Sequence, residues 1–331
     1  MTWLVWRQHR KQLLFGAAAL LVLGAFFLAT GMPMRDRFER SGLPGCLPQT
    51  IDSTVVANLY TENPGGGDAG ANVDDATATI TRCAQTADEF YDDYQYVFDV
   101  GLLLLVLPML VGMFWGAPLV ARELEHGTHR LVWAQGTSRL RWAATKIGLV
   151  SVGVLAITAI YASMLSWWIT PVIQTSGQRF DFGIFDLHGI VVFGYTIFAL
   201  ALGVFAGAVT GRLLPAMAIT VVGFLATRLV VMLAARPRYL PTETARADLL
   251  GPSPSFDNQQ WNLLHGDWIR SRSSGGREGC AAGRPDDCVE ILIIHPARHF
   301  WAFQAIETGV FIALSICLVI GTTYWIRRRI A

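Results

Sequence analysis

The sequence is poor in charge and lacks the motifs that mark many enzymes. Only 15% of its 331 residues are charged, whereas soluble domains carry about 25%. There is no G-x-x-x-x-G-K-[ST] segment, so this chain has no phosphate-cradling loop of its own. There is no H-E-x-x-H segment either, and the closely spaced His126 and His129 have no convincing third ligand. We expect no catalytic residue, metal site or bound cofactor in this chain, and no nucleic-acid partner.

Apolar residues are abundant instead, and they gather in six long runs. About 20 apolar residues in a helix span the hydrocarbon core and satisfy their own backbone hydrogen bonds there. The runs predict spans over 13–31, 101–120, 147–170, 189–210, 213–235 and 301–326. Six such runs leave too little polar sequence to cover a soluble globule, so the predicted fold is an all-α integral membrane protein. The first run exceeds the usual core of about 7–15 residues in a signal peptide, which favours a retained helix over a cleaved signal.

Basic residues predict the orientation of the spans. Arginine and lysine in short loops mark the cytoplasmic side, and this pattern fits a chain with both ends inside. The cytoplasmic segments are then 1–12, 121–146 and the basic tail 327–331. The extracellular segments are the long loops 32–100 and 236–300 and the short loop 171–188. The tryptophans and basic residues of 1–12 also predict an amphipathic helix at the membrane interface.

Four cysteines agree with this orientation, because all four lie in the two long outer loops. Disulfides persist in an oxidising exterior, and four cysteines allow three pairings. We favour Cys46–Cys83 and Cys280–Cys288, since each bond stays within one loop. Two bridges between the loops are the alternative.

Three charged residues lie within or beside the spans and are candidates for a function, as intramembrane charges are by default. Arg228 lies deep in the fifth run, Glu307 near the outer end of the sixth, and Asp99 just before the second. A buried Arg228 needs a partner, and depth makes Glu307 and Asp99 the candidates. The alternative is a purely structural pair, or a side chain that snorkels to the headgroups.

The polar stretch 121–146 predicts a helix, a tight turn, a short helix, a second turn and another helix. Gly127 can end the helix that leaves the second run, and Thr128 can cap the next one. The short helix over 129–135 exposes Leu131 and Trp133 on a charged platform. Such an element is suited to docking in a groove of a cytoplasmic partner.

This stretch resembles the segment between the second and third spans of ABC-2 type permeases, the membrane subunits of ATP-binding-cassette exporters. The matching residues are Glu123, Glu125, Gly127, Thr128, Leu131, Ser138, Arg139 and Lys146. The six spans, the interfacial helix and the large loop before the last span are similar too, as is the segment 295–307. The long first outer loop with its cysteines departs from many relatives.

The resemblance implies that the short helix is a coupling helix, which transmits the closure of the ATPase subunits to the spans. The residues that it places at this contact are Arg122, Glu123, Glu125, Thr128, Arg130, Leu131, Trp133 and Arg139. It also implies two ATP-binding subunits that hold ATP and Mg, and a second permease subunit in a homodimer. It further implies a location in the plasma membrane and the export of an amphipathic, lipid-like, peptide or drug substrate. Only two of the 26 basic residues are lysines, which indicates a GC-rich genome and, with the family, an actinobacterial source.

Two other classes of protein stay open. A membrane-embedded enzyme would need convergent acids, bases or a metal site at the bilayer face, and the sequence has no such cluster. A ligand-sensing membrane protein with disulfide-capped outer loops would have no need of a coupling segment.

Overall fold

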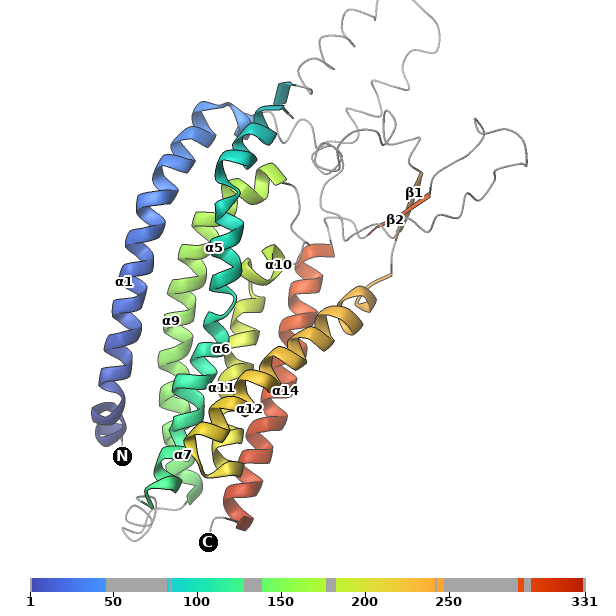
Figure 1. The fold of residues 1–331 in the computed structure, drawn as a ribbon. Helices are drawn as coiled ribbons and strands as arrows, with labels where there is room; N and C mark the ends of the chain where they lie inside the picture. Colours follow the sequence, from blue (N-terminus) through green and yellow to red (C-terminus); the bar gives the residue numbers. More distant parts are fainter. Residues whose placement is uncertain are drawn as a thin grey trace, which may run out of the picture.

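The computed structural model describes residues 2–45, 82–83, 85–127, 139–176, 183–241, 243–246, 291–294 and 299–329. Within these residues six helical stretches are long and apolar enough to cross a membrane. They are Leu13–Arg40, Tyr96–Glu125, Ala144–Thr175, Val191–Thr210, Leu213–Arg238 and Phe300–Arg328. The predicted number of spans is confirmed. The first residues of the first helix and the last residues of the final helix lie at the same end of the bundle (Figure 1).

The second span is a broken helix rather than a continuous one. It consists of α5 (Tyr96–Leu104), α6 (Leu107–Val111), the π-helical turn η1 (Gly112–Gly116) and α7 (Ala117–Glu125). Pro108 in α6 has no N–H to donate to the Leu104 carbonyl, which lies one turn earlier. The hydroxyl of Tyr161 donates to that carbonyl instead, with 3.3 Å between the oxygens. A neighbouring span thus replaces the lost bond, as is required where no water is present.

The fourth span, α11 (Val191–Thr210), forms the core of the bundle. Its apolar window is 83% buried, whereas that of every other span is 28% buried or less. Small residues let the second span approach it closely. A methyl group added at Gly116 would lie 2.7 Å from the Leu200 carbonyl oxygen, and one added at Gly207 would lie 2.6 Å from the Ala117 carbonyl oxygen. The two backbones are therefore in direct contact, as in the small-xxx-small packing of membrane helices.

The first span, α1 (Thr2–Arg40), lies at the edge of the bundle and packs on α9 (Arg139–Ser176) (Figure 1). The ring of Phe27 stacks on Trp168 with 4.9 Å between the centroids. The indole Nε1 of Trp168 donates to the hydroxyl of Thr30 at 2.8 Å. Most of the remaining surface of α1 is open to lipid or to a partner.

Several helices continue beyond the predicted membrane boundaries, because hydropathy marks the apolar core and not the end of a helix. Helix α1 ends at Arg40 instead of residue 31, and residues 85–94 are helical too. These two extensions pack together through Phe38 and Phe90, whose ring centroids lie 5.5 Å apart. The predicted outer loop 32–100 therefore begins and ends as helix.

The all-α description misses a small sheet in the second long loop. Strand β1 (Glu243–Arg246) pairs antiparallel with β2 (Ile291–Ile294), with Glu243 opposite Ile294 (Figure 1). Each strand has four residues, too few for a period-two pattern to identify. The pair joins the segment that follows the fifth span to the segment that precedes the sixth, α14 (Phe300–Arg329).

Part of the predicted organisation lies outside the described residues. Residues 2–12 of the predicted interfacial segment form the first turns of α1, and the position of this segment in the membrane stays a prediction. Thr128, Arg130, Leu131 and Trp133 of the predicted coupling helix are not among the described residues. Cys46, Cys280 and Cys288 are not among them either, so both disulfide pairings stay predictions. Cys83 is buried, and the free cysteine of the described residues is Cys317.

The contact between the second and fourth spans leads to a prediction for Gly203. A methyl group there would overlap the Gly112 carbonyl and lie 2.7 Å from the Ala117 nitrogen, so G203A should destabilise the fold by about 1–3 kcal/mol, as overpacking does. Thermal unfolding in detergent would measure the loss. The matched control is G309A in α14, where the added methyl meets no atom within 4 Å and alanine should be neutral or stabilising. Equal melting temperatures for the two variants would contradict the close packing.

Candidate functional site

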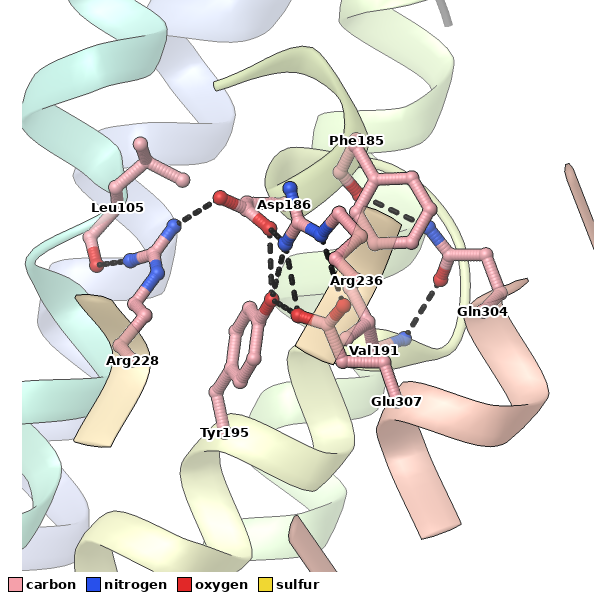
Figure 2. Close-up of polar contacts among 9 residues, drawn as sticks. All are labelled: Leu105, Phe185, Asp186, Val191, Tyr195, Arg228, Arg236, Gln304 and Glu307. Carbon is pink, nitrogen blue, oxygen red and sulfur yellow. Dashed lines mark hydrogen bonds and ion pairs between the residues drawn. The ribbon is translucent and has the colours of Figure 1, made fainter. Parts of the chain in front are cut away.

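Three buried charged side chains and one partly buried arginine, Arg228, lie together in the half of the bundle that lies away from the chain termini (Figures 1 and 2). Asp186 comes from the short helix α10 (Ile184–Leu187), Arg228 from α12 (Leu213–Val230), Arg236 from η3 (Arg236–Arg238) and Glu307 from α14. The formal charges of this buried network, two arginines and two carboxylates, sum to zero. Charges removed from water must be paired in this way.

Arg236 is the centre of the network (Figure 2). Its Nε donates to Glu307 Oε2 at 2.9 Å, and its Nη2 donates to Glu307 Oε1 at 2.7 Å. The same Nη2 donates to Asp186 Oδ1 at 2.5 Å. The guanidinium carbon lies 4.3 Å from the centre of the Phe185 ring. This one side chain therefore joins α14 to α10.

Arg228 joins a third helix to the network. Its Nη2 donates to Asp186 Oδ2 at 2.6 Å, and its Nη1 lies 3.5 Å from the Leu105 carbonyl oxygen. Leu105 lies at the break in the second span, where the regular helical ladder is interrupted. The guanidinium of Arg228 also lies over the Tyr195 ring, 4.9 Å from the ring centre. The break and the buried network are thus physically connected.

A π-helical turn brings the two arginines to the same side of the fifth span. Arg228 and Arg236 are eight positions apart, a spacing that separates side chains by about 80° on a regular α-helix. Between them lies η2 (Val231–Ala235), whose π-helical geometry takes up about one extra residue. The spacing then equals about two full turns, and both guanidinium groups reach Asp186 (Figure 2).

Helix α10 is held by a polar side chain as well as by charge. The amide Nε2 of Gln304 donates to the Phe185 carbonyl at 2.9 Å, and its Oε1 accepts the Val191 N–H at 2.9 Å. Gly189 lies between these two points with φ +87°, a conformation that favours glycine. Gln304 of α14 thus bridges the two ends of the turn that connects α10 to α11.

Tyr195 completes the network from α11. Its hydroxyl lies 2.6 Å from Asp186 Oδ1 and 2.5 Å from Glu307 Oε1, so it can donate to either carboxylate. With the arginine bonds, both carboxyl groups are hydrogen-bonded at each oxygen. A buried acid needs such partners to remain charged.

The sequence analysis identified only part of this network. Arg228 does have a buried partner, but the partner is Asp186, so the expectation of Glu307 or Asp99 was wrong. Glu307 belongs to the network through Arg236. Asp99 is exposed and is not part of the network. Asp186 and Arg236 were missed because both had been assigned to outer loops.

A second polar site lies at the opposite end of the bundle, where α7 leaves the membrane region. Lys146 Nζ donates to Glu123 Oε1, and both side chains are largely buried. Glu125 Oε2 accepts the N–H of Leu213, the first residue of α12, at 3.0 Å. A carboxylate at a helix N-terminus satisfies a free donor and complements the helix dipole. The end of α7 is thus fastened to both α9 and α12.

The predicted end of this helix is confirmed. Helix α7 stops at Glu125, and Gly127 follows with φ +68°, the left-handed conformation of a C-terminal glycine. Arg122 is exposed on α7, and Arg139 is the first residue of α9. The predicted docking segment therefore begins where the fastened helix ends.

The buried network predicts that single charge removals are costly and that a matched pair of removals is less so. D186N leaves an excess positive charge and R228M an excess negative one, so each should lower the unfolding free energy by about 3–5 kcal/mol. The double variant restores neutrality and should lose clearly less than the sum. Chemical unfolding in detergent would measure all three variants.

The matched control for this cycle is D99N, an exposed aspartate outside the network that should change stability by less than about 0.5 kcal/mol. Additive losses in the double variant would show that Asp186 and Arg228 do not interact.

A comparison with known families agrees with this architecture. The family model described as ABC-2 membrane transporter related matches residues 17–236, more than half of the chain. The match includes the Glu123–Lys146 pair and ends at Arg236, so it does not extend to the segment 295–307. No curated protein and no solved structure matches the chain. On the strength of the family match, this chain belongs to the ABC-2 membrane transporter related family.

Proposed function

We propose that this chain is the permease subunit of an ABC exporter, driven by ATP hydrolysis on a separate subunit that docks on the segment after α7. The observation that carries the proposal is the double fastening of α7, by Glu123 to Lys146 and by Glu125 to the Leu213 N–H. A force applied to the segment after Gly127 would act on three spans together. This is what a coupling element requires.

The fastening also explains why carboxylates occupy these two positions. Glu123 neutralises Lys146 at the start of the third span, and Glu125 caps the start of the fifth. Helix α7 itself packs on α11, the most buried span. A displacement of α7 would therefore reach the centre of the bundle as well as its edge.

The remaining parts of the proposal come from the family. Two copies of the chain would form a homodimer in the plasma membrane, each docked on one ATP-binding subunit that holds ATP and Mg. Both ends of each chain would be cytoplasmic, and an amphipathic, lipid-like, peptide or drug substrate would move outward. In this arrangement the permease does no catalysis, and its contribution is the substrate path and its opening.

The proposal predicts that E125A uncouples the two subunits without separating them. The variant loses the bond to the Leu213 N–H, but it keeps the predicted docking residues Leu131 and Trp133. We expect the ATP-binding subunit to co-purify with the variant as it does with the wild type. We also expect stimulation of its ATPase activity by the permease to fall several-fold, measured with the complex in lipid nanodiscs.

The control is E39A, which removes an exposed carboxylate in the last turn of α1. It should leave both the binding of the ATP-binding subunit and the stimulation of its ATPase activity unchanged. W133A should instead abolish co-purification. If the wild-type chain retains no ATP-binding subunit, the exporter proposal is wrong.

A further inference from the structure

A membrane-facing groove lies between the third, fourth and sixth spans, apart from the buried network and the predicted docking segment. Its volume is about 280 Å³. Ile147 and Ser151 of α9 form one wall, Leu200 and Val204 of α11 form the floor, and Ile316 and Ile320 of α14 form the other wall. The lining is almost wholly apolar, with Ser151 and Ser315 as its polar members. Ser315 donates its hydroxyl to the Phe311 carbonyl of its own helix.

We propose that this groove binds one acyl chain of an anionic phospholipid, whose phosphate is held by Arg327. The floor is buried, since Leu200 is 4% and Val204 1% exposed, whereas the α14 rim is open, with Ile316 55% and Ile320 61% exposed. The groove is therefore accessible from the hydrocarbon region and closed on its inner side. A chain seated there touches three helices, and such dispersion contacts add up.

Arg327 lies in line with the groove at the end of the sixth span. The α14 residues of the groove follow a three- and four-residue spacing, which continues through Thr323 to Arg327. Arg327 is exposed, and none of the described residues forms an ion pair with it. Arg328 points elsewhere, because its guanidinium lies over the Tyr324 ring at 4.9 Å. One cation is thus free to meet a phosphate, while its neighbour is engaged.

The depth of the groove fits one leaflet. With a rise of about 1.5 Å per residue, Ile320 lies about 10 Å from Arg327 along the helix and Ile312 about 22 Å. One leaflet, with its headgroup region included, is about 20–22 Å deep, so Ile312 lies near the bilayer midplane. A headgroup at the level of Arg327 would therefore place its acyl chain along the groove. The leaflet is the one on the side of the two chain termini.

A second copy of the chain is the competing occupant, and the shape of the groove argues against it. A stable protein interface removes about 800 Å² of surface from each partner, which requires a broad face. The groove is a narrow concavity with walls from α9 and α14 and a floor from α11. Cys317 is free and exposed on α14 next to Ile316. A second copy that covers the groove should therefore bring two such cysteines close enough to crosslink.

The test uses the full chain in phosphatidylcholine nanodiscs that contain a phosphatidylglycerol with a photoreactive group in one acyl chain. Irradiation followed by peptide mapping should label the α14 segment 312–320, and excess unlabelled phosphatidylglycerol should suppress this labelling. I316W fills the groove and should abolish the suppressible labelling. I160W is the matched control, because Ile160 of α9 is 52% exposed and does not line the groove. Labelling that excess lipid does not suppress, or equal effects of the two tryptophans, would overturn the site.

A second measurement tests the headgroup. Native mass spectrometry should find one phosphatidylglycerol retained per chain, with retention about fivefold weaker in R327Q, as expected for the loss of one basic residue at a membrane surface. R328Q should retain the lipid as the wild type does, and equal losses would overturn the role of Arg327. Mild oxidation should leave the chain monomeric on a denaturing gel. Rapid, near-complete crosslinking that C317S prevents would show a second copy over the groove and would contradict the proposal.

Discussion

Inside a bilayer a carbonyl, a carboxylate or a guanidinium has no water to bond, so each must find its partner within the protein. Much of this structure follows from that constraint. The break at Pro108 leaves the Leu104 carbonyl without its helical donor, and Tyr161 supplies one. Arg228 reaches both the neighbouring Leu105 carbonyl and Asp186. The same residues that satisfy each other also hold α10, α12 and the second span together.

The buried network is better understood as a means of fixing positions than as a large source of stability. Burying an ion pair costs desolvation that the attraction only partly offsets, and well-packed apolar residues of similar volume often do as well. Apolar contacts, however, do not fix the orientation of one helix against another as hydrogen-bonded charges do. Arg236 specifies which oxygens of Asp186 and Glu307 face one another, and so fixes how α10 sits against α14.

The spans could be predicted from the sequence because length and hydropathy are local properties of each run. The end of α7 at Gly127 could be predicted too, since a helix-ending glycine needs no information from elsewhere. The partners of the buried charged side chains could not be predicted in this way. Asp186 is buried only because α10 turns back into the bundle, and Arg236 reaches it only because η2 is a π-helical turn. Neither event has a local signal in the sequence, since Gly183 and Gly189 look like ordinary loop glycines.

The pairing of Glu123 with Lys146 shows the same limit. Both residues belong to the pattern that resembles the permease family, yet the pattern says nothing of their contact, which joins two helices across 23 positions. Conversely, the apolar residues that the sequence predicts to be exposed after Gly127 indicate a docking element, and only the resemblance implies which partner it contacts. Local pattern predicts what kind of element a segment forms, and the geometry of the bundle decides what each side chain touches.

The position of α11 has a consequence for how this protein is made and how it can change. Its mean hydropathy of 2.1 equals that of the exposed fifth span, although its window is 83% buried against 28%. During insertion every span meets lipid before it meets its neighbours, so α11 must be apolar enough to enter the bilayer and small enough to be enclosed afterwards. Glycine and alanine meet the second demand, and valine, leucine and phenylalanine the first. The helix that touches lipid least in the finished bundle is therefore constrained twice, at two different times.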